Sequence, residues 1–351
     1  MNSRPTLAAV AARAGVSPST ASLAFADSPR VAAPTRERVL AAAAALGYAG
    51  PDPLAASLRR GRSGVIGAFV GERLLYAFRD PVAVQLLDGI TEVLGPHGVG
   101  LLLLAGDTGR PSAQQIARIP LDAAIFATCG LEDDPALDQL RARGVPVVAV
   151  EGPVVEGVVL VDIDDLRGTR ELARHLHELG HRRVEVVTMP LRLDGTRGLV
   201  DGQRRGRAHY RDVRHRLQGV EDVFGPVPAF ETASNSVAEG AVAGRALLDV
   251  PTRRRPTALI AQSDVLAAGV LQAAAELGLR VPEQLSVAGF DGAELPWLGA
   301  TVLTSVVQPT DEKGRAAARA AMALVRGERP PDVTLPVTLR VGTTSAPPPA
   351  D

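Results

Sequence analysis

Four small hydroxyl side chains lie close together near the N-terminus of the chain, at Ser17, Ser19, Thr20 and Ser22. Hydroxyl groups in the first turns of a helix bond phosphate oxygens and let the helix approach a nucleic-acid backbone closely. The spacing of these residues therefore indicates a helix end that binds the phosphates of a DNA duplex.

The residues around this cluster predict two short helices joined by a tight turn. Thr6 can cap the first helix, whose apolar residues recur every three or four positions. Gly15 follows the last apolar position, and glycine is typical of the left-handed residue that ends a helix. Ser17 and Pro18 are typical of the start of the second helix. A helix-turn-helix of this kind places its second helix in a DNA major groove, although an ordinary helical hairpin has the same pattern.

A third helix is predicted at 35–46, ended by Gly47 and followed by Tyr48. Farther along, Asp52 and Pro53 can cap and start a short helix that runs to about residue 61. The N-terminal module of three helices is therefore expected to lead into a linker helix.

This part of the chain resembles the DNA-binding headpiece of the LacI/GalR (lactose/galactose repressor) family of bacterial transcription regulators, and the resemblance extends over nearly the whole chain. The matching residues read VAARAGVSPSTAS, SPRV, TRERVLAAAAALGY and AASLRRGRSG. The resemblance implies that the linker is a hinge helix that folds on the operator. It also implies that Leu58 wedges into the central minor groove, where an apolar side chain kinks the duplex. Packing of Leu58 within a linker is the alternative.

The residues expected to contact DNA follow from the helix positions and from the resemblance. The hydroxyl cluster and Tyr48 should bond phosphates, whereas Pro18, Ser19 and Leu23 should meet base edges. Many members of the family have arginine where this chain has Leu23, so the preferred half-site should differ by one base, a change worth about 1–3 kcal/mol. The full expected set is Thr6, Ser17, Pro18, Ser19, Thr20, Ser22, Leu23, Arg30, Tyr48, Ser57, Leu58 and Arg59.

Composition and charge limit the class of protein. A chain of 351 residues, 46% of them hydrophobic, is long enough for two or three domains with sizeable cores. The net charge is −1, but the first 63 residues hold eight arginines against three acidic residues, so a basic end precedes a mildly acidic body. This distribution is typical of a module that binds a duplex.

Residue usage and motifs argue against several other classes. The one cysteine, Cys129, lies in an apolar run and is expected to be a buried, inert thiol, which fits a reducing cytoplasm. Neither a signal peptide nor an apolar stretch of about 20 residues is found, so we expect no membrane partner. The chain has no G-x-G-x-x-G, P-loop lysine, zinc-ligand cluster or G-x-S-x-G, and we expect it to be no enzyme and to hold no cofactor or metal.

From residue 64 onward, apolar strands alternate with helical patterns. The predicted helices are 82–94, 112–118, 135–143, 167–179, 237–248 and 265–277, and the predicted strands are 65–70, 101–105, 123–127, 145–150, 158–162, 184–188, 258–261 and 286–290. This alternation implies parallel sheets that are covered on both faces. The units are too many for one sheet, so two α/β lobes are expected.

The resemblance implies that these lobes have the periplasmic-binding-protein type I fold, with a ligand cleft between them and three chain crossings, which we expect near 162–165, 291–295 and 334–337. The predicted fold class is thus an all-α helix-turn-helix headpiece with a hinge helix, followed by a two-lobed α/β effector domain. The expected organisation is a headpiece (1–50), a hinge (51–63), an effector-binding and dimerisation domain (64–345) made of lobe 1 (64–162 and 292–335) and lobe 2 (163–291 and 336–345), and a disordered tail (346–351).

Ligands of open α/β sheets bind beyond the carboxyl ends of the strands, so polar residues that follow the strands are candidate effector contacts. These residues are Asp80, Asp164, Ser263, Asp291 and Gln308. By resemblance Arg216 joins them, after an arginine-rich stretch (189–215) that is longer than the family pattern and is expected to form a flexible loop at the cleft edge. A carboxylate with an arginine fork suits sugar hydroxyls or the edge of a purine. Helix capping is the alternative role for Asp164 and Asp264.

These features together predict a repressor that binds a pseudo-palindromic operator as a homodimer and responds to a small-molecule effector, a sugar or related metabolite. Effector binding is expected to change the spacing of the two hinges and thereby the affinity for the operator. A cytoplasmic ligand-binding protein and an architectural DNA protein with a vestigial pocket are the alternatives.

Overall fold

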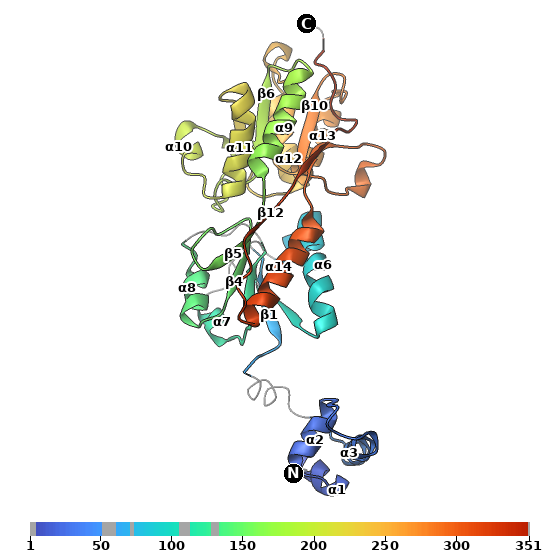
Figure 1. The fold of residues 1–351 in the computed structure, drawn as a ribbon. Helices are drawn as coiled ribbons and strands as arrows, with labels where there is room; N and C mark the ends of the chain where they lie inside the picture. The colour runs from blue at the N-terminus through green and yellow to red at the C-terminus, as the bar shows by residue number, and fades with distance from the viewer. Residues whose placement is uncertain (1–4, 51–60, 71–73, 105–112, 128–132, 350–351) are drawn as a thin grey trace. The chain divides into compact units, whose positions relative to one another are not determined.

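The computed structural model describes residues 5–50, 61–70, 74–104, 113–127 and 133–349 (Figure 1). The chain divides into two units, residues 1–64 and 65–351, and each unit has its own hydrophobic core. The residues Ser57, Leu58 and Arg59, which were predicted to belong to a hinge helix, and the single Cys129 lie outside the described residues.

The first unit is a helix-turn-helix followed by a third helix. Its elements are α1 (Leu7–Ala14), α2 (Pro18–Phe25) and α3 (Ala33–Leu46). The predicted caps of α1 are confirmed, because the Thr6 hydroxyl accepts from the amide of Ala9 at 3.2 Å and Gly15 has a φ of 67°. α3 begins two residues before its predicted start, since Pro34 suits the first turn of a helix.

Small apolar residues from all three helices and from the turn before α3 form the core of this unit. They are Val10, Ala11, Ala21, Ala24, Val31, Val39, Ala42 and Ala43. Two of them, Ala21 and Ala24, lie on one face of α2 and pack inward. The opposite face of the same helix, which carries Ser19 and Leu23, is exposed.

Two sheets of mainly parallel strands define the two lobes of the second unit. Sheet A, in lobe 1, has the order β12-β5-β4-β3-β1-β2 and is parallel throughout. Sheet B, in lobe 2, has the order β13-β11-β10-β9-β6-β8-β7 and is antiparallel only at its two edge strands. All eight predicted strands are present. The strands are β1 (Val65–Phe69), β2 (Gly100–Leu104), β3 (Ala123–Phe126), β4 (Val147–Val150), β5 (Val158–Ile163), β6 (Val184–Thr188), β7 (Gly198–Leu199), β8 (Ala229–Glu231), β9 (Ala258–Ala261), β10 (Ser286–Asp291), β11 (Thr304–Val307), β12 (Val333–Leu335) and β13 (Thr338–Arg340).

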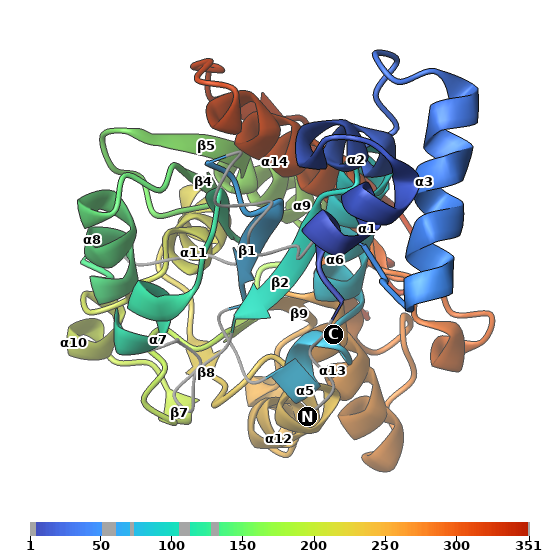
Figure 2. The ribbon, with the colours of Figure 1, turned by 90° about the horizontal axis from the view of Figure 1, so that it is seen from below.

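Helices cover both faces of each sheet, which confirms the predicted α/β fold with two lobes. In lobe 1, α6 and α14 pack on one face of sheet A and α7 and α8 on the other (Figure 2). In lobe 2, α12 and α13 pack on one face of sheet B and α9 and α11 on the other. These helices, with the short α5 and α10, are α5 (Leu74–Ala77), α6 (Pro81–Leu94), α7 (Ala113–Arg118), α8 (Pro135–Ala142), α9 (Asp165–Glu178), α10 (Gly202–Arg205), α11 (Arg211–Phe224), α12 (Val237–Leu248), α13 (Asp264–Glu276) and α14 (Thr310–Val325).

The chain passes between the lobes three times, and one of the three expected positions is wrong. The first crossing follows β5 and the third lies between β12 and β13, near the predicted residues. The second was expected near 291–295, but β11 pairs with β10 in sheet B, in a register that sets Val307 beside Asp291. The chain therefore stays in lobe 2 until residue 307 and crosses just before α14, because residues 304–307 add a buried parallel strand to sheet B.

Backbone contact fixes the first turns of α14 against α6. A Cβ atom at Gly314 would lie 2.2 Å from the carbonyl oxygen of Leu86, and one at Gly89 would lie 2.1 Å from that of Asp311. Both distances are too short for any side chain, so the two glycines are required for this close approach.

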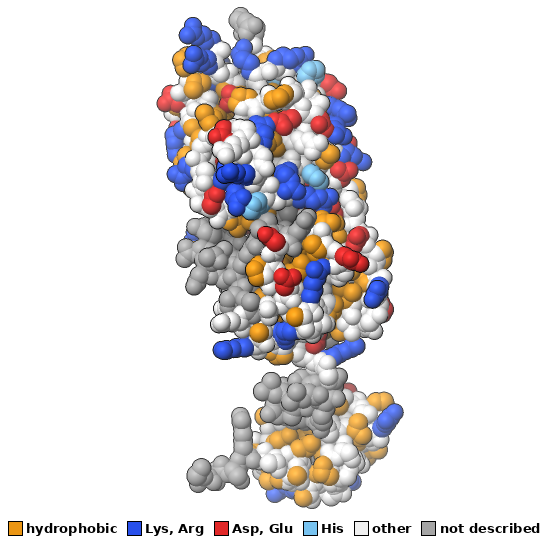
Figure 3. Space-filling model, turned by 90° about the vertical axis from the view of Figure 1, so that its left-hand side faces the viewer, with side chains coloured by type: hydrophobic (Ala, Val, Ile, Leu, Met, Phe, Trp, Pro, Cys, Tyr) orange, Lys and Arg blue, Asp and Glu red, His pale blue; other side chains and the backbone are white. Residues whose placement is uncertain are grey.

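The arginine-rich segment that was expected to be a flexible loop is held by ion pairs at the edge of sheet B. The guanidinium of Arg204 bonds Asp194 at 2.7 Å and Glu231 at 2.6 Å. Figure 3 shows the basic and acidic side chains intermixed over this lobe. The segment forms α10 and β7, and β7 extends sheet B as an edge strand. Ion pairs with nearby acidic residues hold Arg204 of this segment in place.

The C-terminal tail that was expected to be disordered from residue 346 is ordered at its start. The amide of Ala346 donates to Ser286 Oγ at 3.0 Å, and its carbonyl oxygen lies 2.9 Å from His181 Nε2. Just before it, Thr344 is 0% exposed and donates to the carbonyl of Val287 at 2.6 Å. Hydrogen bonds to lobe 2 hold this segment in place. Such bonds leave no apolar pattern in the sequence, so the order of the segment was not predicted.

Candidate nucleic-acid interface and effector site

One face of α2 presents the small side chains that were predicted to contact DNA. They are exposed or half-buried: Ser17, Pro18, Ser19, Thr20, Ser22 and Leu23. The largest, Leu23, is 37% exposed. Because no long side chain stands on this face, the helix backbone can approach a groove closely.

Three hydroxyl groups form a hydrogen-bonded cluster at the N-terminus of α2. Ser17 Oγ accepts from the amide of Thr20 at 3.1 Å, which confirms its predicted capping role. The same oxygen lies 2.8 Å from Ser19 Oγ and 2.9 Å from Thr20 Oγ1. Hydroxyl donors at the positive end of a helix are suited to a phosphate.

An ion pair fixes the turn that follows α2, and the sequence reasoning missed it. Arg36 of α3 bonds Asp27 at 2.6 Å, and its other nitrogen donates to the carbonyl of Ser28 at 3.0 Å. Asp27 has a φ of 51°, so the clamp holds a conformation that non-glycine residues seldom adopt. The pair joins the turn after α2 to α3, so it is not one of the i,i+3 or i,i+4 charge pairs that can be recognised within a single helix.

The other residues of the headpiece that were predicted to contact DNA differ in their exposure and in their contacts. Thr6 is exposed, although its hydroxyl caps α1. Arg30 is exposed on the turn after α2, with its side chain open to solvent. The ring of Tyr48 is half-buried and packs edge-on against Phe25, with 5.6 Å between the centroids.

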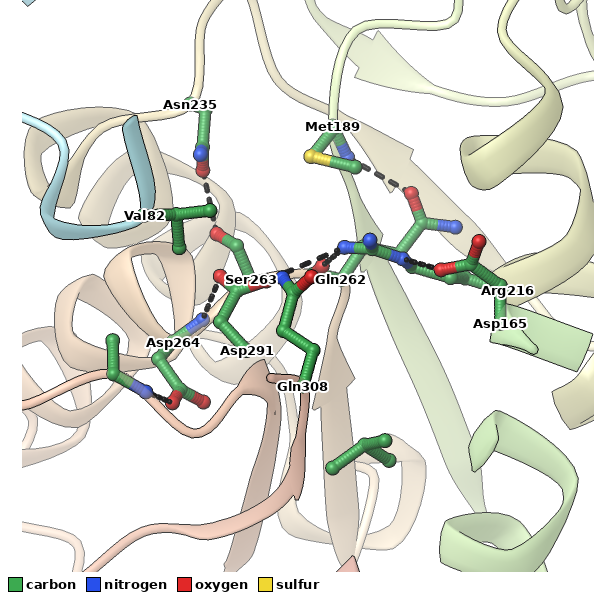
Figure 4. Close-up of polar contacts among 12 residues, drawn as sticks. Val82, Asp165, Met189, Arg216, Asn235, Gln262, Ser263, Asp264, Asp291 and Gln308 are labelled. Atoms are coloured by element: carbon green, nitrogen blue, oxygen red, sulfur yellow. Dashed lines mark hydrogen bonds and ion pairs between the residues drawn. The ribbon is translucent and has the colours of Figure 1, made fainter. Parts of the chain in front are cut away.

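In the second unit, three of the predicted effector residues lie together at the carboxyl ends of β10 and β11 (Figure 4). Gln308 donates from Nε2 to Asp291 Oδ1 at 2.7 Å. The same carboxylate oxygen is 3.6 Å from Arg216 Nη1. Asp291 has a φ of 122°, a strained value for a residue with a side chain, of the kind that clusters at functional sites.

Arg216 is held on several sides. Its Nε donates to Asp165 Oδ1 at 2.7 Å and its Nη1 to the carbonyl of Gln262 at 2.7 Å. Its guanidinium carbon also lies 3.7 Å from the centroid of the Phe290 ring. The residue is 3% exposed, so its fork is oriented rigidly by the protein.

The remaining predicted effector residues cap helices. Asp80 accepts from the amide of Val82 at 2.9 Å at the start of α6, and Ser263 accepts from that of Leu266 at 3.1 Å at the start of α13. Asn235 links the two, because its Oδ1 accepts from the Ser263 hydroxyl at 2.5 Å and its side chain also hydrogen-bonds Asp80.

Asp164 makes a local capping contact. It accepts from the amide of Arg167 at 3.0 Å as the cap of α9 and is exposed. Its neighbour Asp165 is the carboxylate that bonds Arg216. Both acids follow β5 in the sequence. Asp164 is the N-cap of α9 and Asp165 is its first residue, so their side chains point in different directions.

Asp264, weighed from the sequence as an effector contact or a helix cap, accepts from Ser305 Oγ at 2.6 Å and from the amide of Ala293 at 2.8 Å, so it fixes the loop after β10. Another buried polar residue of the site was not predicted. Lys313 of α14 bonds both Glu151 and Gln308. Because Lys313 lies inside a helix, its partners could not be inferred from the sequence spacing.

Burial raises the pKa values of three carboxyl groups in the site. It raises the pKa of Asp165 to about 7, against the effect of Arg216 and with the help of the charges of Glu151 and Asp212. Burial likewise raises the pKa of Asp264 to about 6 and that of Asp291 well above its usual value. Carboxyl groups that hold or release a proton near neutrality can both donate to and accept from hydroxyl groups.

The described residues hold neither a metal-ligand cluster nor a membrane span. No group of three or more histidine, cysteine or acidic side chains in that part of the chain is placed to hold a metal ion. None of its helices combines the length and hydropathy that crossing a membrane requires.

The chain matches two protein families. Residues 6–50 match the bacterial regulatory proteins of the lacI family, and residues 173–345 match the periplasmic binding protein-like domain. An HTH-type transcriptional regulator of Mycobacterium tuberculosis is 36% identical over 354 residues, which cover 98% of each chain.

Two solved structures are similar in fold. The complex of the transcriptional regulator CelR with cellobiose has a TM-score of 0.67 and 27% identity, and the match covers 97% of this chain and 100% of that chain. The lac repressor dimer bound to operator and the anti-inducer ONPF has a TM-score of 0.77 and 24% identity, over 97% and 99% of the two chains.

Proposed function

Because the chain belongs to the LacI family of DNA-binding transcriptional regulators, which are not enzymes, we propose that it is a cytoplasmic repressor under the control of a small-molecule effector. In this proposal it binds a pseudo-palindromic operator as a dimer, and the effector is a sugar or related metabolite.

The recognition face of α2 carries the proposal. Pro18, Ser19 and Leu23 are exposed on a helix of eight residues, and Ser17 aligns hydroxyl groups at the helix end. We assign Pro18, Ser19 and Leu23 to base edges and the hydroxyl cluster to phosphates. Thr6, Arg30 and Tyr48 are assigned to the backbone of the same half-site.

Dimerisation is supported by exposed apolar side chains at the start of lobe 1. Leu75, Phe78 and Val84 are 57%, 58% and 44% exposed, and all three belong to α5, α6 or the turn between them. Exposed apolar side chains in one segment favour contact with another protein surface. The lac repressor, which shares the fold, is a dimer on its operator in its solved complex, and we propose the same assembly here.

The effector site is assigned to the polar residues at the carboxyl ends of the strands, namely Asp80, Arg216, Ser263, Asp291 and Gln308. Carboxylate, amide and guanidinium groups held in fixed orientations match the alternating donors and acceptors of a polyol. CelR binds cellobiose in its solved complex, which supports a carbohydrate here as well. Asp164, an exposed cap, is the weakest member of the predicted set and is retained only as a residue at the rim.

Selection of duplexes from a random pool tests the DNA part of the proposal. We expect enrichment of one sequence with two half-sites, and the absence of any enrichment would contradict it. Thermal shift with ribose, cellobiose and a set of nucleosides then tests the effector part. If the protein selects an operator but no compound stabilises it, an architectural role with a vestigial pocket replaces the regulated one.

A further inference from the structure

The only lysine of the chain lies buried next to the proposed effector site. Lys313 is one lysine among 38 basic side chains and is 2% exposed. It lies in the first turns of α14, where the helix dipole and the loss of water both disfavour a positive charge. Strong contacts must therefore compensate for its burial.

Two oxygen atoms provide those contacts, one in lobe 1 and one on the crossing segment. Lys313 Nζ bonds Glu151 Oε1, directly after β4 of sheet A. It also bonds Gln308 Oε1, between β11 of sheet B and α14. Burial alone would raise the pKa of Glu151, but the charges of Lys313 and Arg216 hold that pKa below its usual value, so Glu151 is charged.

The hydrogen bonds continue from this lysine into lobe 2. The amide nitrogen of Gln308 donates to Asp291 at 2.7 Å, and that carboxylate lies 3.6 Å from Arg216. Arg216 in turn bonds Asp165, the first residue of α9. An unbroken series of buried polar contacts thus runs from sheet A to sheet B through a single ammonium group.

We propose that Lys313 couples the two lobes, so that its contacts with Glu151 and Gln308 set which arrangement of the lobes is populated and thereby tune the affinity for the operator. Without the ammonium group, the crossing segment before α14 loses its charged anchor. The balance between lobe arrangements then shifts, and binding that depends on that balance shifts with it. The DNA readout of this inference rests on the proposed function.

Four variants separate coupling from simple stability. Lys313→Met removes the ammonium group, and Lys313→Arg keeps a positive charge at the same position on a larger side chain. Glu151→Met/Lys313→Met removes both buried charges, which restores stability but not the contact with Gln308. Arg319→Met, an exposed arginine of the same helix that pairs with Glu312, is the matched control.

Operator affinity is measured by fluorescence anisotropy on the selected duplex without any added compound. We expect Lys313→Met and the double variant to differ from wild type by about fivefold or more in Kd. Lys313→Arg should stay closer to wild type, and Arg319→Met should match it. If the stable double variant binds the operator as wild type does, Lys313 has only a structural role and the inference is wrong.

Amide exchange of the full chain gives a second test that needs no DNA. We expect the amides of residue 308 and of residues 310–313 to exchange about tenfold faster or more in the double variant than in wild type, with little change in Arg319→Met. Unchanged exchange in that segment would overturn the inference even where an operator is found. Failure of wild type to select any duplex contradicts the proposed function instead, and the exchange result still decides the coupling.

Discussion

Arg216 and Asp165 form an ion pair of 2.7 Å between side chains that are 4% and 3% exposed. The pair joins α11 to the first residue of α9 and places the guanidinium beside Asp291 at the end of β10. An arginine held in this way presents a fixed fork to its surroundings. The same pair makes the proposed effector site a part of the core of lobe 2, so changes there affect stability as well as binding.

Removing the guanidinium should therefore destabilise the protein strongly. In Arg216→Met, Asp165 and Asp291 remain buried without their cation, and we expect a loss of about 3–5 kcal/mol in the free energy of unfolding. Urea denaturation followed by circular dichroism measures it. The control is Arg245→Met, which breaks an exposed pair with Glu276 and should leave the midpoint unchanged. Equal midpoints for the two variants would contradict the assignment.

The contact between α6 and α14 leaves no room even for a methyl group at Gly314. In Gly314→Ala the new Cβ would meet the carbonyl oxygen of Leu86 at 2.2 Å, and backbone atoms cannot move aside without shifting a helix. We expect destabilisation by about 1–3 kcal/mol or more, although alanine favours helix. Gly95→Ala, at a position with nothing within 4 Å, should be neutral. Thermal unfolding of the two variants compares them, and similar melting temperatures would refute the close packing.

The buried carboxyl of Asp165 should make stability depend on pH. Its pKa rises from 3.8 to about 7 on folding. Between these values the folded state binds the extra proton, so this contribution is present at low pH and is lost as the pH rises towards 7. The free energy of unfolding of wild type minus that of Asp165→Asn should fall by up to about 1.4 kcal/mol per unit between pH 5 and pH 7. A difference that stays constant over this range would show that Asp165 titrates normally.

Leu23 should set one base of the half-site. An arginine at this position can bond guanine through two hydrogen bonds, whereas leucine offers only an apolar contact to a thymine methyl group. We expect Leu23→Arg to change the preferred base at one position of each half-site, by about 1–3 kcal/mol. Selection from random duplexes with both proteins measures the change. The same preference in both would mean that Leu23 does not reach the bases.

Local signals in the sequence were sufficient to predict the elements but not the long-range pairing. The caps of α1 and α2 depend on residues next to the helix, and both were predicted from Thr6 and Ser17. The second crossing was misplaced because the pairing of β11 with β10 depends on the whole sheet.

In the candidate site, too, local signals were predicted and long-range contacts were not. Asp291 and Gln308 were found because they follow strands, and the structure brings them within hydrogen-bonding distance. The pairing of Asp165 with Arg216 and that of Lys313 with Glu151 were not predicted, because the partners lie far apart in the chain. Residues that act through distant partners leave no periodic pattern in the sequence.

The affinity of the full-length protein for its selected duplex, compared with a scrambled duplex at two salt concentrations, tests the central claim most directly. We expect the selected duplex to bind at least about 1,000-fold more tightly than the scrambled one, with an affinity that falls steeply as salt rises. Ser19→Glu, which places a negative charge on the exposed face of α2, should abolish the preference. Equal affinity for both duplexes, or full preference in Ser19→Glu, would contradict the account.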